Sequence, residues 1–92
     1  MKITFDPAKR AATLDSRGLD FADAHKVFAG RTLDFPDDRC DYGEPRFICV
    51  GMLSERMVIV VWPPRGEARR IISMRKANER EQARFGQRLG QG

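Results

Sequence analysis

The sequence predicts a single α+β domain with the element order β-α-α-β-β-β-β-α. Its 92 residues are enough for one hydrophobic core but not for two, so we expect residues 1–92 to form one domain. Two near-continuous apolar runs, FICVGML and MVIVVW, are rich in branched side chains, as central strands are. Proline and glycine divide the chain before these runs into helix-sized pieces. Two helices should therefore precede an antiparallel meander, and a short helix should follow it.

The first thirty residues predict a strand and two helices. Residues 2–5 alternate polar and apolar side chains, as a short strand does. Asp6 followed by a proline is a typical helix start, so we expect a helix over residues 7–16 that ends at the next glycine. Asp20 can cap a second helix over residues 21–29, where apolar side chains recur at helical spacing.

The rest of the chain predicts a sheet and a final helix. The four strands of the meander are expected at residues 31–36, 47–53, 57–62 and 68–75. A helix follows at about residues 78–89, and residues 90–92 are expected to form a flexible tail. The two N-terminal helices should pack on one face of the sheet, which leaves the other face open to solvent or to a ligand.

The charge is unevenly distributed. Residues 1–66 hold ten lysines and arginines and ten acidic residues, so residues 67–92 carry the whole net charge of +4. A neutral body with a basic end indicates an anionic partner, either a nucleic acid or an acidic protein. Binding to phosphates would be sensitive to salt.

Several classes of protein are disfavoured. No apolar run approaches the length of a membrane span, and the N-terminus reaches Asp6 before a signal-peptide core can form, so we expect a cytoplasmic protein with no membrane partner. Cys40 and Cys49 lack the spacing of a zinc site or a disulfide framework. We expect two reduced thiols, with Cys49 buried and Cys40 in a loop, and neither a metal nor a cofactor.

Cations gather where the last strand meets the last helix. Strand alternation places Arg69, Ser73 and Arg75 on one surface. In the following helix, Glu81 lies one turn before Arg84. A carboxylate among arginines can act as a base beside a phosphate. Glu81 also has a structural interpretation, because its spacing from Asn78 is that of a capping box.

Three segments of the chain carry a resemblance to a known family. Residues 5–28, 43–53 and 70–85 resemble, in that order, segments of the BrnT toxins of bacterial BrnT/BrnA toxin–antitoxin systems. The resemblance implies a RelE-like ribonuclease fold and a metal-independent endoribonuclease that cleaves messenger RNA and arrests growth. It also implies a BrnA-type antitoxin with a ribbon-helix-helix domain, through which the complex would bind operator DNA and repress its own operon.

The resemblance also implies where the site lies. By motif match, the functional cluster comprises Arg69 or Arg70, Arg75, Glu81 and Arg84. The further basic residues expected to contact RNA are Lys9, Lys76 and Arg80. The chain departs from the family pattern at two places, because Arg17 stands where histidine is usual and Phe85 where tyrosine is common.

RNA cleavage without a metal needs a base for the 2′-hydroxyl proton, cations for the phosphorane charge and an acid for the leaving oxygen. We assign Glu81 as the base, and we assign the phosphate clamp to three arginines: Arg69, Arg70 and Arg75. Arg84 can only stabilise the leaving oxygen, so the acid is unassigned.

Alternatives stay open. The arginines of the last strand can instead pair with the acidic loop at residues 37–44. The whole basic region can also belong to a binding module without catalytic activity. His25 is the only histidine, so a pair of catalytic histidines within one chain is excluded, and we expect His25 to be a partly exposed structural residue.

Overall fold

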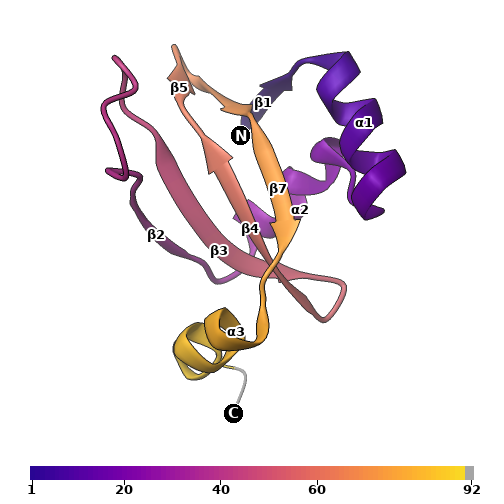
Figure 1. The fold of residues 1–92 in the computed structure, drawn as a ribbon, viewed down its shortest axis with the longest axis vertical. Coiled ribbons are helices and arrows are strands. Elements are labelled where there is room, and N and C mark those ends of the chain that lie inside the picture. The colour runs from indigo at the N-terminus through magenta and orange to yellow at the C-terminus, as the bar shows by residue number, and fades with distance from the viewer. Residues whose placement is uncertain (91–92) are drawn as a thin grey trace.

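The computed structural model describes residues 1–90 and has the predicted α+β architecture (Figure 1). The strands are β1 (Lys2–Phe5), β2 (Leu33–Pro36), β3 (Phe47–Leu53), β4 (Arg56–Trp62), β5 (Pro64–Arg65), β6 (Ala68–Ile71) and β7 (Ser73–Lys76). The α-helices are α1 (Pro7–Arg17), α2 (Ala24–Ala29) and α3 (Glu79–Phe85), with two 3₁₀ turns, η1 (Phe21–Asp23) and η2 (Gln87–Leu89). The predicted tail lies, from residue 91, outside the described residues.

The strands form two sheets, so the prediction of one antiparallel sheet is wrong. β2, β3, β4 and β7 form an antiparallel sheet in that order. A second sheet has the order β1-β6-β5, and in it β1 runs parallel to β6. The sequence predicts no partner for β1 and one continuous strand over residues 68–75, whereas in the structure β1 pairs with the first half of that segment.

That segment is divided by a β-bulge. The N–H of Ile72 donates to the carbonyl of Val61 at 3.0 Å, while Ser73 lies opposite the same Val61 in the register of β4 and β7. Two residues of one strand therefore face one residue of its neighbour, which bends the strand and changes the alternation of its side chains. The chain passes from the small sheet to the large one at this point.

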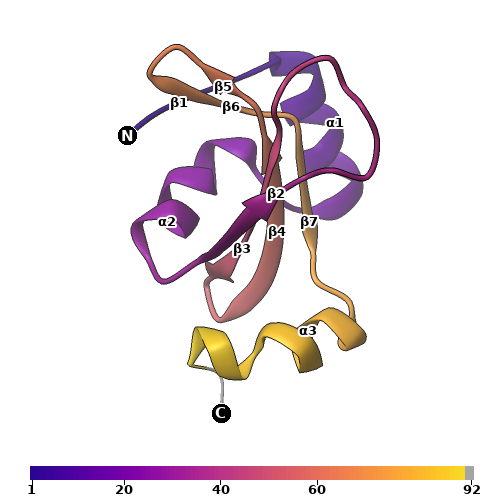
Figure 2. The same ribbon diagram turned by 90° about the vertical axis from the view of Figure 1, so that its left-hand side faces the viewer.

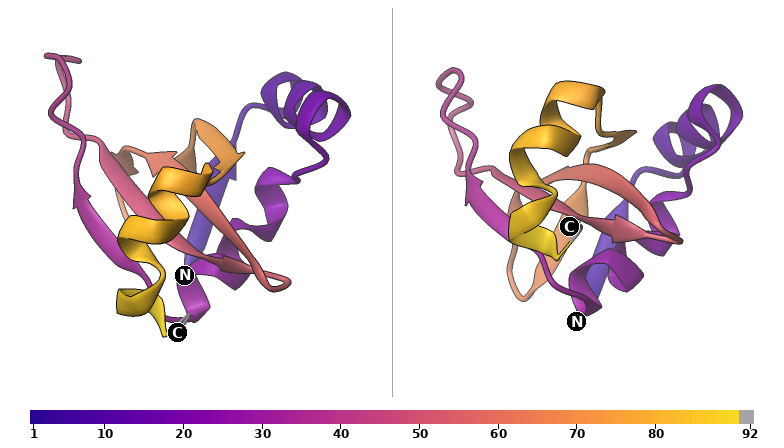
Figure 3. Two further views of the ribbon diagram at one scale, coloured as in Figure 1. Left: turned by 60° about the horizontal axis from the view of Figure 1, so that its bottom comes forward. Right: turned by 90° about the horizontal axis from the view of Figure 1, so that it is seen from below.

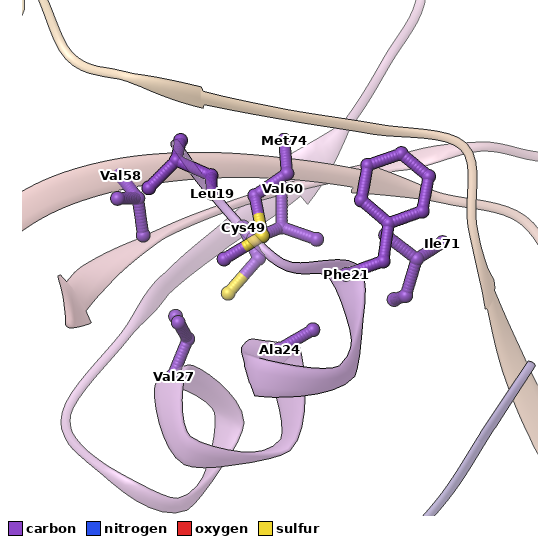
Figure 4. Packing of buried hydrophobic residues seen from close by; sticks show 9 residues of the cluster. All are labelled: Leu19, Phe21, Ala24, Val27, Cys49, Val58, Val60, Ile71 and Met74. Atoms are coloured by element: carbon purple, nitrogen blue, oxygen red, sulfur yellow. The ribbon is translucent and has the colours of Figure 1, made fainter. Parts of the chain in front are cut away.

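One face of the large sheet is closed by α2 and η1. The nine side chains of this core are Leu19, Phe21, Ala24, Val27, Cys49, Val58, Val60, Ile71 and Met74 (Figure 4). A Cβ atom on Gly51 would lie 2.7 Å from Cγ1 of Val27, so the glycine allows α2 to approach β3 closely. Cys49 is buried as predicted, and desolvation raises the pKa of its thiol to about 12, whereas Cys40 is exposed.

The helix α1 lies beside the edge of the large sheet rather than on its face (Figure 1), so the prediction that both N-terminal helices pack on one face is wrong for the first of them. None of its residues 7–17, all of which the structure describes, is buried. Polar contacts hold it instead: Arg10 makes a bidentate pair with Asp20 at 2.7 and 2.9 Å, and Nη1 of Arg17 donates to the carbonyl of Met74 in β7 at 3.0 Å. α1 therefore depends on few contacts with the body of the protein.

The opposite face of the large sheet is covered only at one end, by α3 (Figures 2 and 3). Phe85 and Leu89 pack there against Val50 and Ile59, and the ring of Phe35 stacks on Phe85 at 5.9 Å. Beyond α3, this face is open, as the sequence predicted. Within residues 1–90, no helix is long and apolar enough to span a membrane.

Candidate active site

The open face carries a pocket of about 490 Å³, within the range of ligand-binding clefts. Its floor consists of the apolar residues Phe35, Ile48, Val50, Ile59, Val61, Ile72 and Phe85. Its rim consists of the polar residues Lys9, Arg39, Arg46, Ser73, Arg75, Glu81 and Arg84. Five cations and one carboxylate thus surround an apolar hollow.

The rim is assembled from four parts of the chain. α1 contributes Lys9, and the loop of residues 37–46 contributes Arg39 and Arg46. β7 contributes Ser73 and Arg75, and α3 contributes Glu81 and Arg84. The bulge explains the contribution of β7, because it places both Ile72 and Ser73 on the side of the pocket while Met74 enters the closed core.

Two rim residues, Arg75 and Glu81, form a bidentate ion pair. Nη1 and Nη2 of Arg75 each donate to one carboxylate oxygen of Glu81 at 2.8 Å. Glu81 also accepts from the backbone N–H of Asn78 at 2.9 Å, and Asn78 in turn accepts from the N–H of Glu81 at 2.8 Å. This is the capping box that the spacing predicted. It fixes the carboxylate, which in turn orients the guanidinium.

The same contacts determine the acidity of Glu81. The hydrogen bonds from Arg75, followed by the one from Asn78, lower the pKa of its carboxyl from 4.5 to about 2, although partial burial opposes this. A general base works best when its pKa is near the working pH. In this arrangement Glu81 is a weak base whose two oxygens are both occupied.

The loop of residues 37–46 holds its two rim arginines by different means. Arg39 makes two hydrogen bonds of 2.7 Å to Asp37, whose carboxylate is buried, and these bonds lower the pKa of that carboxyl. The guanidinium of Arg46 lies 3.8 Å from the ring centre of Tyr42, a cation–π contact. The sequence does not predict either arginine as a site residue, because the composition of the loop indicates only an acidic segment.

Of the eight residues that the sequence predicts for the site, the structure brings four together in the pocket. Lys9, Arg75, Glu81 and Arg84 all line the pocket. The predicted residues that are not among its lining are Arg69, Arg70, Lys76 and Arg80.

The prediction that Arg69 shares a surface with Ser73 and Arg75 is wrong. The guanidinium of Arg69 lies 4.6 Å from the ring centre of Phe28 and 4.2 Å from that of Trp62, both of which pack against the closed core. The physical reason is the bulge, which breaks the alternation on which the prediction depended.

The proposed pairing of the last-strand arginines with the acidic loop is not what residues 1–90 show. Within the loop, Asp37 pairs with Arg39, and Glu44 pairs with Arg65 at 2.8 Å. Arg75 pairs with Glu81 of its own neighbouring helix. Among residues 1–90, no group of three or more histidine, cysteine or acidic side chains is placed to hold a metal ion.

A comparison with known protein families identifies the family to which this chain belongs. The model of the family described as "Ribonuclease toxin, BrnT, of type II toxin-antitoxin system" matches residues 5–81 of the chain. The chain belongs to the BrnT family. Its membership implies an RNA substrate and an antitoxin partner, as in other type II systems. A search of curated proteins finds no match.

The match covers most of the pocket of this BrnT-family protein. It extends from the first strand to Glu81, so it includes Lys9, both loop arginines and the residues of β7, whereas Arg84 and Phe85 lie beyond it. Phe85, one of the two departures from the family pattern, is buried against Phe35 and serves the packing of α3. Arg17, the other departure, holds α1 to β7.

Proposed function

We propose that this BrnT-family chain is a metal-independent endoribonuclease that cleaves messenger RNA in the pocket between α1, the loop of residues 37–46, β7 and α3. The observation that carries the proposal is the rim, where five cations line an apolar hollow and two of them, Arg39 and Arg75, are oriented by carboxylates. Guanidinium groups fixed in place can stabilise the extra negative charge of a phosphorane. A RelE-like relationship is part of the same proposal.

Arg75 is the residue that we assign to the scissile phosphate. Glu81 engages Nη1 and Nη2 of its guanidinium, and Asn78 holds Glu81, so the position of Arg75 is set before RNA arrives. Its side chain is 41% exposed, which leaves the group accessible from the pocket. Arg84, exposed on the next turn of α3, is assigned to the charge on the leaving 5′-oxygen.

Glu81 acts as the base after an exchange of partners. An arriving phosphate competes with Glu81 for Arg75. The hydrogen bonds from Arg75 lower the pKa of Glu81, so each bond that Arg75 transfers to the phosphate lets this pKa rise. The freed carboxylate accepts the 2′-hydroxyl proton, the 2′-oxygen attacks phosphorus, and the bond to the 5′-oxygen breaks. Water supplies the proton that the leaving oxygen takes. The products are a 2′,3′-cyclic phosphate and a 5′-hydroxyl end.

The test is cleavage of RNA in EDTA by the purified protein and by the variants Arg75→Ala, Arg75→Lys and Glu81→Gln. We expect Arg75→Ala to lower the rate by roughly 10²–10³-fold, as loss of one oxyanion donor does. Arg75→Lys should recover little, because lysine cannot form the bidentate pair. Arg88→Ala and Glu79→Gln are matched controls, since both residues are exposed near α3 and lie outside the pocket. An active Arg75→Ala variant, or dependence of wild type on added metal, contradicts the proposal.

A binding module without catalysis is the second candidate, and one observation favours it. Both oxygens of Glu81 are occupied and its pKa is about 2, which suits a residue that orients Arg75 rather than one that takes a proton. This candidate predicts RNA binding that Arg75→Ala weakens, with no cleavage by any sample that is folded and free of contaminating nuclease.

The partner that we propose is a BrnA-type antitoxin with a ribbon-helix-helix domain, which carries the complex to operator DNA. Charge supports this choice, because an acidic antitoxin segment is complementary to the five cations of the rim and would cover the site. Co-expression with the product of the adjacent gene tests it: we expect a stable complex that inhibits cleavage and is weakened by Arg39→Ala or Arg84→Ala. A complex that leaves cleavage unchanged contradicts docking at the pocket.

A further inference from the structure

We infer that the apolar floor of the pocket receives one unstacked nucleobase, so that the substrate is RNA with a single-stranded segment. This inference rests on the proposed function and adds to it the class of RNA. It depends on the composition of the pocket: most of its apolar side chains come from the sheet strands β2, β3 and β4, and its cations come from α1, the loop of residues 37–46, β7 and α3.

The floor is covered only in part by the fold: Val50, Ile59, Val61 and Phe85 are buried, whereas its other three side chains are not. Phe35, Ile48 and Ile72 are only half-buried, although they lie on or next to the same sheet whose other face is closed by α2. The ring of Phe35 is stacked on Phe85 with 29° between the ring planes, so it is held in a fixed orientation. A fixed aromatic ring beside branched side chains is a suitable contact for the face of a base.

The rim and the floor together fit a whole nucleotide better than they fit a phosphate alone or an apolar group alone. Phosphates alone need the cations but no apolar hollow, and an apolar side chain of a protein partner needs the hollow but not five cations. A nucleotide places a base below and a phosphate above. Ser73, which also lines the pocket, has a hydroxyl that can donate to or accept from the edge of a base.

Duplex RNA cannot use this arrangement. Its bases are paired and stacked inside an A-form helix, so it presents phosphates and a shallow groove to the protein. A duplex could contact the rim, but the floor would stay empty. Single-stranded RNA can turn one base out of its stack at little cost and fill the floor.

The first experiment measures binding without cleavage. A fluorescent 2′-O-methyl RNA strand is titrated with the protein, alone and annealed to its complement. Unlabelled uridine monophosphate, adenosine monophosphate and ribose 5-phosphate then compete with it. We expect the single strand to bind at least about tenfold more tightly than the duplex, and at least one nucleotide to compete about tenfold better than ribose 5-phosphate, which has the same charge but no base.

The second experiment locates the base with variants. Phe35→Leu should remove most of the advantage of the nucleotide over ribose 5-phosphate and leave the affinity for ribose 5-phosphate unchanged. Ile72→Asn is a second variant that does not disturb the stacking of Phe35 on Phe85. Met52→Leu is the control, because Met52 is half-buried on the same face of β3 but lies outside the pocket. Circular dichroism and urea unfolding confirm that each variant is folded.

The outcomes separate the inference from the proposed function. If ribose 5-phosphate and the nucleotides compete equally, or if the duplex binds as tightly as the single strand, the floor is not a base site and the inference is overturned. The apolar hollow then belongs to an apolar side chain of a partner protein, while loss of cleavage in Arg75→Ala still supports the proposed function. If the protein prefers nucleotides but cleaves no RNA, the result supports the base site and contradicts the proposed endoribonuclease activity.

Discussion

The two faces of the large sheet are built from the same strands but serve different purposes. In β3 and β4, Cys49, Val58 and Val60 point to the face that α2 closes, and each has no exposed surface. Their neighbours in sequence, Ile48 and Val61, point to the face that α3 covers only at one end, and both line the pocket. The strands are apolar on both sides, yet only one side is sealed. An apolar strand face that the helices within residues 1–90 cover only at one end is therefore a candidate for ligand binding.

The two faces of the large sheet also differ in their charged side chains. On the closed face, Arg69 is stacked on two aromatic rings and does not reach the pocket. On the open face, five cations line one hollow. Glu81 and Asp37 offset two of these charges, and repulsion among the rest costs stability in the absence of a ligand. We expect stability to depend mainly on the closed face and RNA binding mainly on the open face. The predictions below test this separation.

The largest effect should come from the closed core. Phe21 is 1% exposed and packs edge-on against Phe5, so Phe21→Ala should lower the free energy of unfolding by about 3–5 kcal/mol. Urea unfolding measures this loss, and the affinity of the folded fraction for RNA should be unchanged. Leu14→Ala, on the exposed α1, is the control and should change stability by less than about 0.5 kcal/mol. Equal losses in the two variants would show that the closed core is not the main source of stability.

The next effect concerns the cations of the rim. If four or five of them each neutralise a phosphate of single-stranded RNA, affinity should fall by roughly 50- to 100-fold between 50 and 200 mM salt. Arg84→Ala should make the slope of log affinity against log salt shallower by about 0.7. Lys26→Ala removes the same charge from α2 on the closed side and should leave the slope unaltered. Equal changes in slope would mean that RNA does not distinguish the two faces.

Much of this comparison could be predicted from local sequence signals. The apolar runs predicted β3 and β4, and the helix caps predicted α1 and the capping box, because each depends on residues that are close in sequence. The pairing of Asn78 with Glu81 therefore placed the one carboxylate of the rim correctly. The open face followed from the order of helices and strands.

The remaining features depend on contacts between distant residues. The bulge at Ile72 and Ser73 has no proline or glycine to mark it, so the sequence predicts strict alternation across it, and this places Arg69 on the wrong side. Arg39 and Arg46 belong to an acidic loop, and only the folded chain shows that they turn to the pocket. One signal was available for Arg39, since an aspartate two residues before it can form a local ion pair.

A smaller effect is expected at the edge between the two faces. Arg17 donates one hydrogen bond to the carbonyl of Met74, and this contact joins β7 to the helix that carries Lys9. Loss of one such bond corresponds to about 0.5–1.5 kcal/mol, so Arg17→Ala should raise KM for RNA roughly two- to tenfold and leave kcat nearly unchanged. Arg17→Lys should recover part of the loss. Ser16→Ala is the control, because its hydroxyl bonds only to Ala12 within α1. A fall in kcat with KM unchanged would assign Arg17 to the chemistry instead.

An effect of similar small size should come from the contribution of the Arg75–Glu81 pair to stability. The pKa of Glu81 is about 2 in the folded protein against an ordinary value of 4.5, so the pair stabilises the fold above about pH 4.5 and this contribution is lost as pH falls toward 2. Because Arg75 is 41% exposed, solvent screening limits the contribution to about 1 kcal/mol. Urea unfolding of wild type and Glu81→Gln should therefore differ by about that amount at pH 7 and converge near pH 2, while Glu79→Gln shows no such convergence. A difference that persists unchanged at pH 2 would mean that the carboxylate stabilises α3 by its capping geometry alone, and that its charge is free to act on RNA.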